Sequence, residues 1–92
     1  MSYGRSPGMI SLLYFASLRE RLDCAREDFA LPPGTPTVET VVDRLRSRDG
    51  RWSEAFAPGR AWRVAVNQRM ADLATPLKPG DEVAFFPPVT GG

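Results

Sequence analysis

The 92-residue chain has no histidine and a single cysteine, Cys24, and these two shortages exclude several kinds of chemistry. One cysteine permits no intramolecular disulfide, so nothing indicates an oxidising compartment, and we expect a cytoplasmic protein. Because no imidazole is available to activate its thiol as a nucleophile, we interpret Cys24 as a structural residue. Only carboxylates and backbone oxygens remain as metal ligands, and we predict no metal site.

The chain also has little net charge and no long apolar run. Twelve Lys and Arg residues against eleven Asp and Glu residues give a formal charge of +1, which supplies no field to attract nucleic acid or anionic lipid. A membrane-spanning helix needs about 20 apolar residues in succession, and no segment has them. We expect binding neither to nucleic acid nor to a membrane. The local arginines fall toward the end of a predicted helix, where cations complement the helix dipole, at Arg44, Arg46, Arg48 and Arg51.

Length and composition predict a single globular domain. The chain is 42% hydrophobic and 25% charged, as in ordinary folded domains. We place this domain at residues 9–88, between a flexible N-terminal extension at residues 1–8 and a flexible C-terminal tail at residues 89–92. The extension contains glycine and proline but no apolar stretch, and the periodic pattern begins at Met9. Whether Met9 is an alternative start stays open.

Apolar periodicity predicts strands and helices in alternation. Residues 9–15 form a short apolar run that is typical of a central strand buried on both faces, and residues 27–31 alternate as a second strand. Leu18 and Leu22 indicate a short helix between them. The clearest helix begins near Thr37, which is a good N-cap, and Gly50 is expected to stop it. Its apolar stripe consists of Val38, Val41, Val42 and Leu45.

The second half of the chain predicts two further strands. Residues 62–66 alternate with a period of two, and residues 83–86 are apolar on both faces until Pro87 and Pro88 end them. Pro79 and Gly80 fit the centre of a type II turn before the last strand. Together the elements predict an α+β domain of β-grasp (ubiquitin-like) architecture, in which one long helix packs across a mixed sheet.

The end of the chain is its most informative segment. Two prolines stiffen the exit from the last strand, and the terminal Gly91 and Gly92 lack a Cβ, so they fit a channel that is too narrow for other residues. A frayed C-terminus is the plain alternative. A terminal Gly-Gly pair arises by chance in roughly 0.5% of chains when glycine makes up about 7% of residues, and it therefore suggests a function.

From Met9 to Gly92 the chain resembles the ubiquitin-like sulfur carriers, and among them the small subunits of molybdopterin synthases. The most specific block is residues 80–92, GDEVAFFPPVTGG, and it is supported by residues 65–68, AVNQ, and residues 14–16, YFA. Ubiquitin and the thiamine-pathway sulfur carrier share the terminal glycines. The acidic, aromatic and proline residues before them are more similar to the molybdopterin synthase subunits.

The resemblance implies a role for Gly92 as an acyl carrier of sulfur. An E1-like adenylating enzyme would use ATP to activate the Gly92 carboxylate, and a sulfur donor protein would convert the acyl adenylate to a thiocarboxylate. The mixed anhydride with AMP has a good leaving group, which a free carboxylate lacks. The chain itself would bind no cofactor. Its tail would enter the large subunit of molybdopterin synthase within a heterotetramer, where two such sulfurs convert cyclic pyranopterin monophosphate to molybdopterin.

The resemblance also implies a docking surface for that partner. Phe15, Met70 and Phe86 match apolar positions that contact the large subunit in the family, and each has a rival interpretation as core. Docking is favoured for Phe86. Phe85 and Phe86 point to opposite faces of one strand, and only one of these faces can pack against the helix. Both interpretations of Phe15 and Met70 stay open. The tail would contribute the remaining partner contacts, at Pro87, Pro88, Val89 and Thr90.

Three other functions stay open at this stage. The chain could carry sulfur for thiamine or another thiolated product, or it could be a protein modifier joined through Gly92 to lysines of its targets. It could also be a binding module in which the glycines have no chemical role. The block at Phe86, Pro87 and Pro88 favours molybdopterin synthesis over these alternatives.

Overall fold

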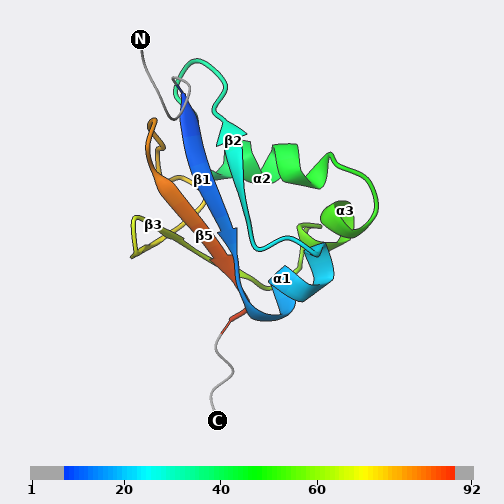
Figure 1. Cartoon of the computed structure of the whole chain (residues 1–92). Helices are drawn as coiled ribbons and strands as arrows, with labels where there is room; N and C mark the ends of the chain where they lie inside the picture. The colour runs from blue at the N-terminus through cyan, green and yellow to red at the C-terminus, as the bar shows by residue number, and fades with distance from the viewer. Residues whose placement is uncertain (1–7, 89–92) are drawn as a thin grey trace.

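The computed structural model describes residues 8–88; the extension up to residue 7 and the tail at residues 89–92 lie outside the described part. Within the described residues, five strands and three helices follow one another (Figure 1). In chain order they are β1 (Met9–Tyr14), α1 (Ala16–Leu22), β2 (Arg26–Ala30), α2 (Val38–Arg46), α3 (Arg51–Ala55), β3 (Arg63–Val66), β4 (Arg69–Ala71) and β5 (Glu82–Phe86). No helix within residues 8–88 is long and apolar enough to cross a membrane.

The strands form one mixed sheet in the order β2-β1-β5-β3-β4, which confirms the predicted sheet type. β5 lies in the centre, parallel to β1 and antiparallel to β3, so the last strand of the chain is held from both sides. The remaining pairs, β1 with β2 and β3 with β4, are antiparallel. The three helices lie together on one side of the sheet, at the right of Figure 1.

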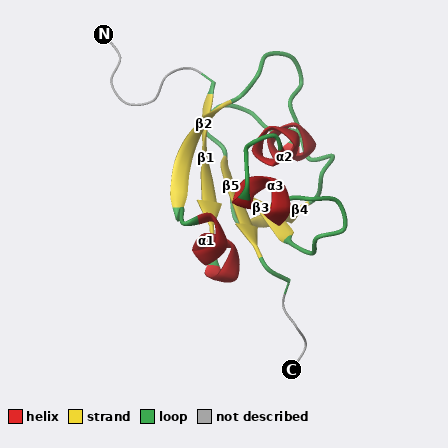
Figure 2. Ribbon diagram, turned by 90° about the vertical axis from the view of Figure 1, so that its right-hand side faces the viewer, coloured by secondary structure: helices red, strands yellow, loops and turns green. Residues whose placement is uncertain are grey.

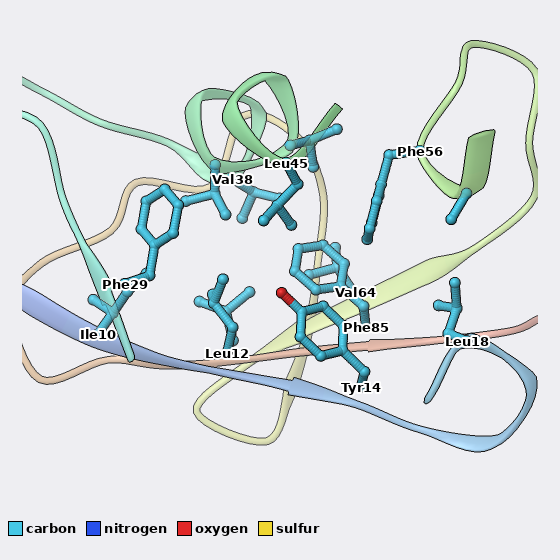
Figure 3. Close-up of a cluster of buried hydrophobic side chains, with 14 of the residues drawn as sticks. Ile10, Leu12, Tyr14, Leu18, Phe29, Val38, Leu45, Phe56, Val64 and Phe85 are labelled. Atoms are coloured by element: carbon cyan, nitrogen blue, oxygen red, sulfur yellow. The ribbon is translucent and has the colours of Figure 1, made fainter. Parts of the chain in front are cut away.

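The hydrophobic core fills the space between the sheet and these helices. Figure 3 shows Tyr14 and Phe85 rising from neighbouring strands toward Leu45 of α2. Phe85 is fully buried and stacks on Tyr14 at a centroid distance of 6.0 Å. It also meets Phe56 edge to face at 5.2 Å, an arrangement that aromatic pairs favour. The predicted apolar stripe of α2, at Val38, Val41, Val42 and Leu45, is buried throughout.

The N-terminus of α2 is capped mainly by another segment of the chain. The Val38 and Glu39 N–H groups donate to the carbonyls of Thr75 and Leu73, at 3.0 Å each. Thr37 is the N-cap residue as predicted, and its own N–H donates to Thr40 Oγ1 at 3.0 Å. Two of the unpaired N–H groups at the helix start are thus satisfied by the 72–76 loop, which fixes that loop against the helix.

Arg48 has a different role from the one predicted for it. Its guanidinium donates to both carboxylate oxygens of Glu27 on β2, at 2.9 and 3.0 Å, and lies 4.4 Å from the centroid of the Trp52 ring. The buried Tyr14 hydroxyl donates to Glu27 as well, at 2.8 Å. Burial, and then this hydrogen bond, raise the pKa of Tyr14, so the phenol stays protonated. The cluster ties the end of α2 to an edge strand.

Asp81 holds the start of β5 in place. This buried carboxylate accepts from Asn67 Nδ2 at 3.0 Å, from the Lys78 N–H at 2.9 Å and from Lys78 Nζ at 3.0 Å. Asn67 Oδ1 in turn accepts from the Glu82 N–H at 3.0 Å. Burial by itself would raise the pKa of Asp81, but the hydrogen bonds from Asn67 and Lys78 outweigh it and lower the pKa below its ordinary value of 3.8.

Replacing this carboxylate is expected to weaken the fold in a pH-dependent manner. Asp81→Ala should lower the free energy of unfolding at pH 7 by about 1–3 kcal/mol, because Asn67 and Lys78 lose a buried, charged acceptor. Since the folded pKa is depressed, the stabilisation is present above pH 3.8 and is lost as the pH falls through the folded pKa. Urea unfolding between pH 7 and pH 3 measures both effects. An Asp81→Ala chain whose stability falls as steeply in acid as that of the unaltered chain would contradict the assignment.

Candidate functional site

The face of the sheet opposite the helices carries a continuous apolar band. Within residues 8–88 no helix covers this open face. The strand register aligns Leu13 with Ala84, Ala84 with Ala65, and Ala65 with Met70, which gives one row across four strands. Side chains at cross-strand positions lie on the same face, and the buried Tyr14, Phe85 and Val64 point the other way. The row is half-buried except for Met70, which is 63% exposed.

Two phenylalanines extend this band toward the end of β5. The Phe15 N–H donates to the Phe85 carbonyl at 3.1 Å, so the β1–β5 ladder continues past Tyr14 and brings Phe15 beside Phe86. Phe15 has an extended backbone and is 43% exposed, and Phe86 is half-buried beside Arg63 of β3. We call the six side chains together the open-face band: Leu13, Phe15, Ala65, Met70, Ala84 and Phe86.

The open-face band corrects one prediction about the sheet. The strand at residues 9–15 was expected to be buried on both faces, and that expectation is wrong, because the helices cover only one face. Leu13, Ala65 and Ala84 were not singled out from the sequence, although their alternation with buried neighbours was a usable signal. Phe15, Met70 and Phe86, which were singled out, do lie on one face together. The structure thus places all three outside the core.

Polar residues limit the open-face band on one side. The next row along the sheet pairs Ser11 with Asp28 on β2 and with Glu82 on β5, and this row ends the apolar surface toward the start of β1. An apolar centre with a polar border is the usual composition of a protein–protein interface. Large exposed side chains such as Phe15 and Met70 are common among residues that contribute most to binding.

The tail begins at the edge of the open-face band. β5 ends at Phe86, and Pro87 and Pro88, both half-buried, are the last residues that the structure describes. The other predicted tail residues, Val89, Thr90, Gly91 and Gly92, lie outside the described residues. Because β5 is the central strand, the chain leaves the sheet next to Phe15 and Phe86 and not at a remote edge.

The helix side of the sheet has a groove of about 520 Å³ between α2, the 57–63 segment and β4, and Met70 of the open-face band also contributes to its lining. Phe56, Trp62 and Val64 form part of its apolar lining, and the exposed Leu73 lies at its border. The acidic and cysteine side chains of residues 8–88 form no cluster of three that would suit a metal ion. The open-face band and the adjoining tail therefore remain the candidate site.

Comparison with known proteins identifies the family of this chain. Residues 12–92 match the model of the ThiS family. The molybdopterin synthase sulfur carrier subunit of Escherichia coli (strain K12) is 42% identical over 84 residues, which span 91% of this chain and all of that protein. The corresponding subunit of Mycobacterium tuberculosis (strain H37Rv) is 39% identical, over 90% of this chain and 96% of that one.

Solved structures confirm the β-grasp fold. SAMP1 of Haloferax volcanii has a TM-score of 0.75 at 29% identity, with 92% of this chain and all of that chain covered. A second solved structure is the complex of subunits 1 and 2 of molybdopterin-converting factor from Helicobacter pylori. One chain of that complex is similar to this chain with a TM-score of 0.63 and 25% identity, over 91% of this chain and 99% of the other. By sequence and by fold, this chain belongs to the ThiS family and, within it, to the sulfur carrier subunits of molybdopterin synthase.

Proposed function

We propose that the chain carries sulfur on the terminal carboxylate of Gly92 and delivers it to the large subunit of a molybdopterin synthase. An E1-like enzyme joins the carboxylate to AMP with release of pyrophosphate from ATP, and sulfur from a donor protein then displaces AMP to leave a thiocarboxylate. In the synthase this sulfur passes to cyclic pyranopterin monophosphate. Two rounds supply the two dithiolene sulfurs of molybdopterin.

The main support for the proposal is that the match to the family model extends to Gly92. The geometry supports it, because the central strand β5 leads the chain out beside an exposed apolar band. The large subunit would cover that band and receive the tail, in a heterotetramer of carrier and large subunits. The groups that act on the pterin would belong mainly to the large subunit. A cytoplasmic setting is part of the proposal and is supported by the single cysteine.

A second candidate function has its own support. One of the solved structures similar to this chain is the small archaeal modifier protein 1 of Haloferax volcanii, at 27% identity and a TM-score of 0.66. If this chain acted in the same way, the activated Gly92 would be transferred to a lysine of a target protein and not to sulfur. Both functions begin with the same acyl adenylate, so only the acceptor differs.

The chemical state of Gly92 distinguishes the two functions. We expect protein isolated from its native host to include a form in which one terminal oxygen is replaced by sulfur, and we expect no conjugate with a target lysine. Intact-mass spectrometry would detect the exchange. Oxidation of Met70 or Cys24 adds almost the same mass, so fragment ions limited to the last residues of the chain must carry the gain. An unmodified terminus under every growth condition, or a lysine conjugate alone, would refute sulfur carriage.

A further inference from the structure

A small crevice lies at the root of the tail, between α1 and the segment that precedes β3. It measures about 220 Å³ and is lined by Ser17, Leu18, Arg21, Ala55, Arg60, Ala61 and Pro87. Figure 2 shows α1 beside the end of β5, where the chain leaves the sheet. Because Pro87 directly follows β5 and also lines the crevice, a protein that takes up the tail must come close to this crevice.

Among residues 8–88, the only charged side chains that line the crevice are two arginines. Arg21 comes from α1 and Arg60 from the segment before β3, and both are exposed. None of the three ion pairs found in residues 8–88 involves either of them. Glu20, next to Arg21 in the sequence, and Glu54, next to Ala55, do not line the crevice. The crevice is therefore cationic, with an apolar lining from Leu18, Ala55, Ala61 and Pro87.

Docking at the tail changes the surroundings of these two arginines. Water solvates their guanidinium groups in the free chain, and a partner that covers the tail root removes part of that water. Removing water from an unpaired charge is unfavourable unless the partner supplies an opposite charge. A guanidinium presents parallel N–H donors that match the two oxygens of a carboxylate, and an apolar lining strengthens such a pair.

We propose that the crevice receives an acidic side chain of the large synthase subunit, at the mouth of the channel that admits the tail. Arg21 and Arg60 hold its carboxylate, and the crevice is continuous through Pro87 with the tail root beside the open-face band. The inference rests on the proposed function, which supplies the partner and the direction of approach. It adds an electrostatic contact that orients the carrier before the tail enters.

Charge reversal tests the contact. In the full-length chain, R21E/R60E should slow association with the large subunit by about tenfold at low ionic strength, and high salt should reduce the difference. Stopped-flow fluorescence at several salt concentrations would measure the rate. R44E/R51E is the matched control, because it changes the net charge equally at two exposed arginines that do not line the crevice. Thermal unfolding of each variant shows whether it is folded.

A conservative variant provides a second readout. R21K/R60K retains both charges and should associate nearly as fast as the unaltered chain. Lys78 is the only lysine of the natural sequence, so the variant places new amines specifically at the crevice. A carbodiimide that couples amines to carboxylates without a spacer should then join position 21 or 60 to an aspartate or glutamate of the large subunit. Peptide mass spectrometry would identify that residue.

The outcomes separate this inference from the proposed function. Equal association rates for R21E/R60E and R44E/R51E, or the absence of a cross-link from positions 21 and 60, would overturn the crevice contact. If R21E/R60E weakened binding only to the adenylating enzyme, the crevice contact would also be overturned, since the acidic side chain that enters the crevice would then belong to a different partner. In each case a thiocarboxylate on Gly92 would leave sulfur carriage intact, whereas its absence would refute sulfur carriage without affecting the binding result.

Discussion

Deletion of Gly92 is expected to abolish molybdopterin formation while the fold keeps its stability. The shortened chain ends at Gly91, and its carboxylate stops about 3.5 Å short of the position that the reaction requires. A misplacement of even 1 Å can cost about a hundredfold in rate. The core lies between Ile10 and Phe85, so the free energy of unfolding should change by no more than about 0.5 kcal/mol. Urea unfolding and a synthase assay with the large subunit measure the two quantities.

A preformed thiocarboxylate separates activation from delivery. Chemical ligation can place the thiocarboxylate on the full chain and on the shortened chain, so that neither needs ATP or the adenylating enzyme. The full chain should then support synthesis, and the shortened chain should remain inactive because its sulfur does not reach the pterin. If the shortened chain produced molybdopterin, the position of the terminus would not matter, and the proposed mechanism would be wrong.

A charge at Phe86 is expected to break the complex with the large subunit. Phe86→Asp should weaken binding by at least about 30-fold, which corresponds to the loss of roughly 2 kcal/mol at a central interface residue. The fold should survive, because Phe86 lies on the open face and the core aromatic contacts belong to Phe85. Isothermal titration calorimetry would give the affinity and circular dichroism the stability.

Leu73 provides the matched control for this variant. It is 43% exposed, comparable with Phe15, but it lies at the groove on the helix side, and its carbonyl caps α2. Leu73→Asp should therefore leave the affinity within about twofold of the unaltered value, as surface changes away from an interface usually do. Equal effects at both positions would show that the open face has no special role. Unfolding of Phe86→Asp would return Phe86 to the core.

The sequence was sufficient for the fold class and for most elements, because their apolar periods are regular. It did not predict β4, which has only three residues and no alternation of its own. That strand exists because Asn67 and Gln68 both adopt positive φ angles, at 52° and 69°, which suits a tight two-residue hairpin. Glutamine seldom occupies a turn position with positive φ, so Gln68 does not indicate a hairpin in the sequence. The strand that follows this turn was not expected from the sequence.

Contacts between distant parts of the chain could not be predicted at all. Arg48 lies twenty-one positions from its partner Glu27, and Asn67 lies fourteen from Asp81. No periodicity specifies such pairs, since they depend on how the finished sheet and helices approach one another. Helix α2 also ends earlier than expected, at Arg46, and Gly50 instead precedes α3.

The candidate site was only partly readable from the sequence. The terminal glycines and the aromatic and proline block indicated the tail, and the family resemblance together with the alternation along the strand favoured docking for Phe86. For Phe15 and Met70 the sequence left docking and core open, because an apolar residue at a strand end fits either place. The register places both residues outside the core by aligning Met70 with Ala65 and by continuing the β1–β5 ladder to Phe15, and their contact with the large subunit stays a prediction.

The central position of β5 has a mechanical consequence. A carrier must be withdrawn from its partner after each delivery, and traction on its last residues is transmitted directly to β5. The backbone hydrogen bonds that join β5 to β1 on one side and to β3 on the other oppose this force. The load is shared as shear between neighbouring strands and does not peel an edge strand away. We therefore expect the domain to resist unfolding from its C-terminal end when the tail is withdrawn.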